Sequence, residues 1–273
     1  MKWVVDSNQL RDEALARFLA SSRANIALLT DYAAMEALKG DPLVGMFESM
    51  RILSRFPEQV QVLKSTTVVC GLSGAGSGLQ RRLVDFPRSH EFGWFCRSVA
   101  AARSGQSDIA KQLQELGQQA RLHMSRIEAD ARGFADAGVE AAHLFQPAER
   151  VAIVSARRLD PNLNSKLLKN LMTLALFLFE RHPEVRRLPR WSELTNTYIF
   201  RASICSLMLG FEYASVGGVA NKAVARIRND MVDSHFATYA TFFDGLMSKD
   251  DLTLRLYGRT KRVLHLVSSS GDR

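Results

Sequence analysis

The hydrophobic positions of this chain follow two spacings. Short apolar runs alternate with segments in which apolar residues recur every three or four positions, which are typical of buried strands and amphipathic helices respectively. Strands are predicted at Lys2–Val5, Asn25–Leu29 and Val60–Cys70, and helices at 12–20, after a cap at Thr30 or Asp31, and from Pro42 onward. Strands that alternate with helices predict a parallel sheet with helices on both faces.

The pattern changes after the third predicted strand. A glycine-rich stretch at 71–78 is followed, from 79 to 214, by helical spacing only, which is clearest at 109–127 and 164–181. This pattern predicts an all-helical insertion in an α/β domain. Although the glycine stretch follows a predicted strand, it lacks the lysine of a phosphate-binding loop, and we interpret it as a hinge.

The alternation of strands and helices resumes near the end of the chain. Helices are predicted at 222–230, 231–243 and 249–257, and short strands at 245–248 and 263–267. The expected organisation is an α/β domain whose first part is 1–78 and whose second part is 215–273, with the helical insertion at 79–214 between them.

Composition adds a partner class. The 273 residues are 47% hydrophobic, which is enough for a substantial core, and the net charge is +8. Residues 1–80 are balanced in charge, whereas 81–220 carry a surplus of five positive charges and 221–273 a surplus of three. Such an excess attracts polyanions, so nucleic acid is the leading partner and an anionic membrane surface the second. A solvated basic surface explains the charge equally well.

Cysteine usage and hydropathy point to a location. The three cysteines are far apart and form no CxxC pair, which argues against a disulfide framework and a zinc site and fits a reduced cytoplasmic location. No signal peptide is apparent. The most apolar later segment, 167–179, is too short to span a bilayer, so we interpret it as a buried core helix and expect no membrane partner.

Four acidic residues stand out by their positions. Asp6 and Asp250 follow predicted strands, and parallel strands bring their carboxyl ends to one edge of a sheet. Glu36 lies on the helix after the second strand, and Asp233 shares a helix face with Asp230. Clustered carboxylates repel one another unless a divalent cation is present, and oxygen ligands suit Mg²⁺ or Mn²⁺. We expect Asp6, Asp233 and Asp250 to surround one pocket.

Each of these residues also has a structural interpretation. An aspartate after a strand often caps a helix or belongs to a turn, and capping the helix of Asp233 can be the sole role of Asp230. Ser7 and Asn8 can contact a metal-bound water or a phosphate, or can cap the next helix. Three further aspartates lie close in sequence to Asp233 and Asp250, which leaves the identity of the third and fourth metal ligands open: Asp230, Asp244 and Asp251.

At these residues the chain resembles a known family. Val4-Val5-Asp6-Ser7-Asn8 resembles the opening of PIN-domain nucleases, in which two hydrophobic residues precede Asp, Thr or Ser, and Asn. The segment Asp31-Tyr-Ala-Ala-Met-Glu36 is similar to the second helix of that family, which carries an acidic residue. The segments that begin at Asp233 and end at Asp250 resemble its closing pattern, an Asp-bearing helix followed by a short strand and Thr/Ser–x–Asp. The resemblance covers roughly 1–70 and 220–268.

The resemblance implies a PIN-like endoribonuclease with a parallel sheet between helices. It implies that Asp6, Glu36, Asp233 and Asp250 are catalytic and bind Mg²⁺ or Mn²⁺, with Asp230 as a further metal ligand, and that a metal-bound water attacks phosphorus. RNA is the expected substrate, ahead of DNA. The alternatives are a non-catalytic PIN-like scaffold that binds nucleic acid or a partner protein, and a structure-specific DNA nuclease. A homo-oligomer or an inhibitory protein partner is compatible with each of these.

Overall fold

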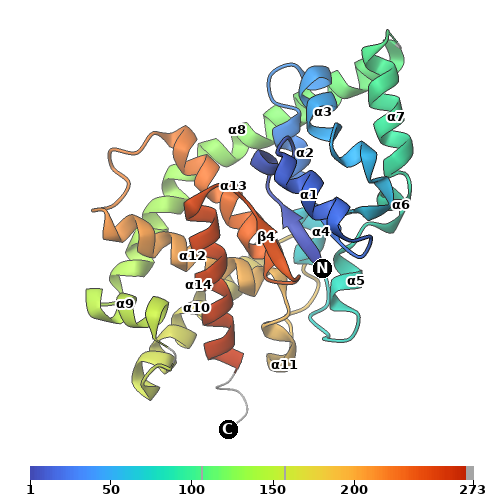
Figure 1. Ribbon diagram of the computed structural model, residues 1–273. Helices are drawn as coiled ribbons and strands as arrows, with labels where there is room; N and C mark the ends of the chain where they lie inside the picture. The colour runs from blue at the N-terminus through green and yellow to red at the C-terminus, as the bar shows by residue number, and fades with distance from the viewer. Residues whose placement is uncertain (106, 157, 269–273) are drawn as a thin grey trace. The chain divides into compact units, whose positions relative to one another are not determined.

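The computed structural model describes residues 1–105, 107–156 and 158–268, and these residues are mostly helical and include one small sheet (Figure 1). The strands are β1 (Lys2–Val5), β2 (Ile26–Leu29), β3 (Val60–Val62) and β4 (Gly245–Met247). The helices before the longest one are α1 (Glu13–Ser21), α2 (Asp31–Ala37), α3 (Pro42–Met50), α4 (Thr66–Cys70), α5 (Leu79–Leu83), α6 (Phe86–His90) and α7 (Phe92–Arg103). The longest is α8 (Ser107–His143), followed by α9 (Pro147–Ser155), α10 (Pro161–Arg181), α11 (Trp191–Leu194), α12 (Tyr198–Ser215), α13 (Val224–Ala240) and α14 (Asp251–Ser268).

The four strands form an all-parallel sheet in the order β3-β2-β1-β4. Val4 lies opposite Leu28 of β2 and Leu246 of β4, so the first strand of the chain pairs with the last (Figure 1, blue and red-orange arrows). The α/β class and the parallel sheet predicted from the sequence are confirmed. The chain steps from β1 to β2 to β3 on one side, whereas β4 lies on the other side of β1. The strand order therefore reverses between β1 and β4.

The local elements form where the sequence supplies their usual signals. Val4 and Val5 are fully buried, as expected for a strand covered on both faces. Thr30 caps α2 by accepting a hydrogen bond from the backbone N–H of Ala33, and Asp41 caps α3, which has proline in its first turn. The cap at Thr30 places α2 directly after the end of β2, and the cap at Asp41 begins α3 a few residues after α2 ends.

Two predicted strands are corrected by the structure. Of the run Val60–Cys70, only Val60–Val62 is a strand, and Thr66–Cys70 forms α4. The predicted strand 263–267 lies within α14, and the helices predicted at 222–230 and 231–243 form the single helix α13. A short apolar run does not distinguish a strand from a buried helix turn. In α14 the buried residues recur at helical spacing from Thr253 to Val267, and this longer pattern decides the outcome.

The described chain divides into two compact units. The first unit contains the sheet and comprises Met1–Thr66, Gln80–Ile127 and Phe243–Asp251. The second unit comprises Thr67–Leu79, Glu128–Phe242 and Leu252–Arg273, and its final range is described as far as Ser268. Within the helical region predicted at 79–214, residues 80–127 thus cluster with the sheet and the remainder with the C-terminal helices.

The second unit has a core built from helices alone. The buried faces of α10 and α12 supply Leu167, Leu171, Phe200 and Ile204, among others. Helices α8 and α12 approach closely at Gly138 and Gly210, where a Cβ atom on Gly210 would overlap the carbonyl oxygen of Gly138. In the part of the chain that the structure describes, no helix has both the length and the apolar character needed to cross a membrane.

Candidate functional site

Asp6 lies at the end of β1, where the strand order reverses. Its side chain is 2% exposed, and its backbone N–H donates to the carbonyl oxygen of Met247 at 2.9 Å, so the pairing of β1 with β4 extends to this residue. The amide nitrogen of Asn8 and the hydroxyl of Ser248 each donate to Asp6 Oδ2 at 2.6 Å, and the Ser7 hydroxyl donates to Oδ1 at 3.3 Å. Three side chains thus hold the carboxylate in place.

The same hydrogen bonds join the ends of β1 and β4. Ser248 Oγ accepts the backbone N–H of Asp250 at 3.0 Å, and Asn8 Oδ1 accepts that of Lys249 at 3.1 Å. We call Asp6, Ser7, Asn8 and Ser248 the Asp6 network. It brings the backbone of Asp250 beside Asp6 through a single serine. Ser248 is not among the predicted site residues, although its position in the Ser–x–Asp pattern that ends at Asp250 indicates a place at the site.

The electrostatics of Asp6 are set by burial. Burial raises the pKa of the Asp6 carboxyl above its usual value, and hydrogen bonds from Ser248, from Ser7 and from the backbone oppose the shift. No ion pair with Asp6 occurs among the described residues, so its side-chain donors are neutral. Because the pKa is raised, Asp6 favours folding most at low pH, and this contribution is lost as the pH rises through the raised pKa.

Glu36 and Asp250 occupy different surroundings. Asp250 is half-buried and lies between β4 and α14. Glu36 is the penultimate residue of α2, is also half-buried, and forms an ion pair with Lys39. Glu36 lies about 7.5 Å along the helix axis from Asp31, at 1.5 Å per residue. Hydrogen bonds among the described residues link Asp6 to the backbone of Asp250 through Ser248, whereas Glu36 is not part of the Asp6 network.

Asp31 is a half-buried carboxylate that the predicted site did not include. It begins α2 at the end of β2, the strand beside β1, and accepts the backbone N–H of Thr66 at 2.8 Å and the Thr66 hydroxyl at 3.1 Å. Burial raises the pKa of the Asp31 carboxyl, and the hydrogen bonds from Thr66 oppose the shift. The sequence carries a signal for this residue, because Asp31 opens the acidic helix pattern, but the pattern predicts it only as an alternative to Thr30 as the helix cap.

Asp230 and Asp233 lie on α13 in the second unit. Asp230 is buried, and its Oδ2 accepts the Tyr213 hydroxyl at 2.8 Å and forms an ion pair with Lys222. Burial and the neighbouring Asp230 raise the pKa of Tyr213, which keeps its hydroxyl a donor. Lys222 thus compensates the charge of Asp230, which favours a structural role for this residue. Asp233 is half-buried.

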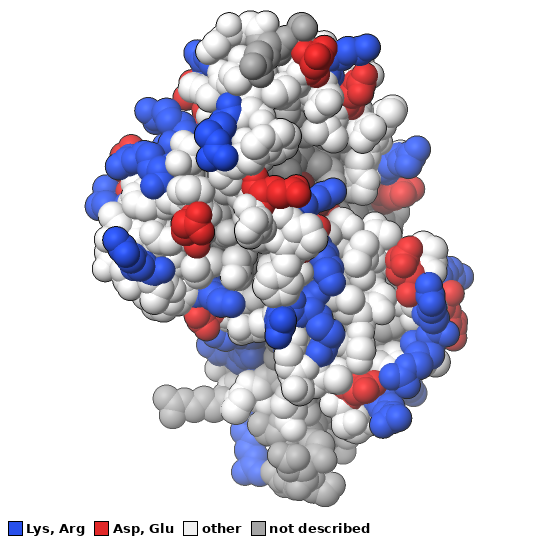
Figure 2. All heavy atoms as spheres, turned by 90° about the vertical axis from the view of Figure 1, so that its right-hand side faces the viewer, with Lys and Arg blue, Asp and Glu red and all other residues white. Residues whose placement is uncertain are grey.

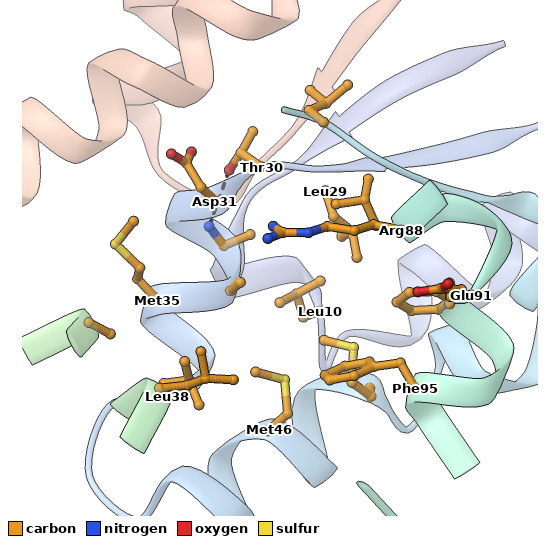
Figure 3. Close-up of a pocket in the computed structure, with 18 of the residues that line it drawn as sticks. Leu10, Leu29, Thr30, Asp31, Met35, Leu38, Met46, Arg88, Glu91 and Phe95 are labelled. Atoms are coloured by element: carbon orange, nitrogen blue, oxygen red, sulfur yellow. Dashed lines mark hydrogen bonds between the residues drawn. The ribbon is translucent and has the colours of Figure 1, made fainter. Parts of the chain in front are cut away.

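A cavity of about 630 Å³ lies at the ends of β2 and β3 in the first unit (Figure 3). Its walls are mostly apolar and include Leu10, Met35 and Met46. Arg88 reaches into the cavity from α6, whereas the carboxylate of Asp31 points away from its interior in the view of Figure 3. The cavity is therefore lined chiefly by hydrocarbon and sulfur, unlike the polar Asp6 network.

The donor chemistry of the Asp6 network suits a hard cation. Its carboxylate is desolvated and has only neutral side-chain donors, so a divalent ion would supply the missing positive charge. Within residues 1–105, 107–156 and 158–268, no three His, Cys, Asp or Glu side chains gather into a group that could hold a metal. Mg²⁺ is commonly bound by one or two carboxylates, with water and substrate phosphates completing its coordination, so the donor set of Asp6 and Asp250 is compatible with it.

Comparison with known proteins adds no relative: no family model, no curated protein and no solved structure matches this chain.

Proposed function

We propose that this chain is a metal-dependent phosphodiesterase, an endonuclease with a PIN-like fold and RNA as its preferred substrate. The observation that carries the proposal is Asp6, a buried carboxylate without an ion-pair partner among the described residues, at the point where the strand order reverses. In open parallel sheets, ligands bind outside the carboxyl ends of the strands at such a reversal.

The residues of the chain have separate parts in this proposal. Asp6 and Asp250 hold Mg²⁺ or Mn²⁺, and Ser248 and Asn8 fix the orientation of the Asp6 carboxylate through their hydrogen bonds at 2.6 Å. The cation, when bound, lowers the pKa of a water molecule and stabilises negative charge on the scissile phosphate. Glu36 and Asp233 remain proposed further ligands on the sequence pattern alone, and we propose that Asp230 stabilises α13.

The net charge supports a polyanionic substrate. The chain carries a charge of +8, and Figure 2 shows Lys and Arg side chains over the face it draws, with a group near the middle of the view. A positive surface raises the local concentration of a polyanion and its rate of association. The surface would hold the nucleic acid, while the carboxylates would supply the cleavage chemistry.

The decisive experiment replaces Asp6 by asparagine. Asn keeps the shape of the side chain and at least one acceptor for Ser248 and Asn8, but removes the charge that a cation needs. We expect cleavage of labelled single-stranded RNA in Mn²⁺ to fall more than about 100-fold, since losing even an indirect metal contact commonly costs 10- to 100-fold. Asp41→Asn is the matched control, because Asp41 is an exposed helix cap whose hydrogen bonds asparagine can keep.

Thermal unfolding separates a catalytic loss from a folding defect. Without metal, Asp6→Asn should melt at or above the wild-type temperature at pH 7.5, because burial penalises the ionised carboxylate. Mn²⁺ at 100 times its Kd should stabilise the wild type by about 2.7 kcal/mol, or about 5–10 °C, and should leave Asp6→Asn unchanged. Undiminished cleavage by Asp6→Asn would refute the proposed site.

The non-catalytic scaffold remains the second candidate. It is favoured by the lack, among the described residues, of a group of three potential metal ligands. A wild-type protein that cleaves no RNA or DNA in Mn²⁺ and shows no metal-dependent shift in melting temperature would favour it. Parallel assays on single-stranded RNA, single-stranded DNA and flap substrates separate a ribonuclease from a structure-specific DNA nuclease.

A further inference from the structure

We propose that residues 181–191 of the second unit, which we call the arginine segment, bind single-stranded nucleic acid. Its arginines would contact phosphates, and Trp191 would stack on an unpaired base. The inference rests on the proposed function for its choice of polyanion, but it does not depend on the metal site or on cleavage.

The first observation is the density of positive charge in the arginine segment. Its charged residues, with histidine counted as neutral, are four arginines and one glutamate: Arg181, Glu184, Arg186, Arg187 and Arg190. Arg186, Arg187 and Arg190 are exposed. Arg187 lies 3.9 Å from a carboxylate oxygen of Glu193 but is 64% exposed, and such an exposed pair is weak enough for a phosphate to compete with it. The segment therefore offers a dense positive charge to a phosphate backbone.

The second observation is the exposed indole of Trp191. It is 58% exposed, and Leu188 nearby is 50% exposed, so the arginine segment presents apolar surface as well as charge. Trp191 begins α11, where the backbone N–H of Arg190 donates to the Glu193 carboxylate at 3.3 Å and that of Glu193 donates to the Arg190 carbonyl at 3.0 Å. These bonds fix the backbone that carries the indole. An indole face beside arginines is the combination with which proteins bind single strands.

The arginine segment is supported by the glycine-rich stretch. A Cβ atom on Gly71 would come within 2.6 Å of the carbonyl oxygen of Glu184, and one on Gly74 would overlap that of Glu193. The two backbones therefore lie in direct contact, which only glycine permits at these positions. A cavity of about 500 Å³, lined in part by Arg186, Arg187 and this stretch, opens beside the segment. A supported surface loses less entropy on binding than a free loop would.

The chemistry favours a single strand over a duplex. Stacking on a tryptophan needs a base whose face is free, and the bases of a duplex are already stacked on one another. Phosphates alone would bind either form. The contribution of Trp191 is thus the feature that identifies the partner.

Binding can be measured without cleavage. The full chain is titrated in EDTA against fluorescein-labelled oligonucleotides of about 12 nucleotides, within the usual site size, and anisotropy is followed. One probe is single-stranded RNA, the second is single-stranded DNA of the same sequence, and the third is a duplex. We expect Trp191→Ala to weaken binding of the single strands by about 5- to 150-fold and Trp191→Phe to weaken it less.

The arginines are tested by salt dependence. The double variant Arg186→Gln/Arg187→Gln should reduce the slope of log K against log salt, measured from about 50 to 200 mM, by about 1.4. Matched controls are Trp94→Ala, which removes an indole that is 62% exposed on α7, and Arg126→Gln/Arg226→Gln, which removes two exposed arginines elsewhere. Neither control should change binding of the single strands by more than about twofold, because none of these residues belongs to the arginine segment or lines the cavity beside it.

The outcomes are distinct. Equal affinity for RNA and DNA, or tighter binding of RNA, supports the proposal if Trp191→Ala also weakens the binding of the single strands. The proposal is overturned if the wild type binds neither single strand at about 50 mM salt, if Trp191→Ala binds like the wild type, or if the controls lose as much affinity as the segment variants. Loss of cleavage in Asp6→Asn with normal binding in EDTA would separate the proposed metal site from this surface.

Discussion

Replacement of Ser248 by alanine tests how the Asp6 carboxylate is held. The variant removes the hydroxyl that donates to Asp6 Oδ2 at 2.6 Å and accepts the Asp250 N–H at 3.0 Å. A hydrogen bond to a charged group contributes about 1.5–3 kcal/mol net, whereas water can replace the acceptor of the partly buried Asp250 N–H. We therefore expect the free energy of unfolding to fall by about 2 kcal/mol at pH 7.5, or about 4–8 °C in melting temperature.

The pH dependence of this loss is the sharper measurement. Ser248 lowers the pKa of Asp6 against the larger effect of burial, so its removal raises that pKa further. A protonated Asp6 needs the donor less, and the difference between wild type and variant should shrink as the pH falls through the raised pKa. Urea unfolding of both proteins from pH 7.5 to about 3.5, below the ordinary aspartate pKa, measures this directly.

Two further variants serve as controls for Ser248→Ala. Ser248→Thr keeps the hydroxyl and should recover most of the stability, and Ser54→Ala removes an exposed hydroxyl that donates to a neutral backbone carbonyl. Ser54→Ala should cost less and show no pH dependence. If Ser248→Ala costs the same at pH 7.5 and 3.5, the hydroxyl does not stabilise an ionised Asp6, and the electrostatic account of the network fails. Cleavage by Ser248→Ala should fall about 10- to 100-fold if Asp6 binds the metal.

Two other predictions concern the second unit. Gly210→Ala should lower the free energy of unfolding by about 1–3 kcal/mol in urea denaturation, because its Cβ would overlap the carbonyl of Gly138, whereas Gly133→Ala, at an open helical position, should raise it by about 0.5–1 kcal/mol. A Gly210→Ala protein as stable as the wild type would contradict this close approach. Lys222→Ala should lower the free energy of unfolding by roughly 2 kcal/mol in the same assay, because it leaves buried Asp230 without its ion-pair partner. The loss should be smaller than for a fully buried pair because Lys222 is partly exposed. Adding Asp230→Asn should restore most of the lost stability.

Much of the α/β part was predictable from local patterns. The runs that end at Val5 and Leu29, the caps at Thr30 and Asp41, and the short strand at Gly245–Met247 all have signals within a few residues. The parallel sheet followed because strands alternate with helices, which leaves few ways to bury both faces. The position of Asp6 at a strand end was predictable for the same reason.

The errors arose where two periodicities compete over a short run. Val263–Val267 reads as a strand by itself, but the buried positions of the whole segment from Thr253 onward follow helical spacing. Thr66 likewise lies within the run predicted as a strand, Val60–Cys70, but is the first residue of α4, and its backbone N–H donates to Asp31 on another element. Such a bond has no local signal, because its partner is distant in sequence.

The sequence by itself determined which residues carry charge, where most helices and strands begin, and that Asp6 ends a buried strand. Only the tertiary structure decided what each carboxylate meets. Asp6 accepts a hydrogen bond from the neutral hydroxyl of Ser248 near the far end of the chain, whereas Asp230 forms an ion pair with Lys222, so two buried aspartates have partners of different charge. The physical reason is that burial and long-range pairing set the energy of a charge, and neither is encoded within a few residues of it.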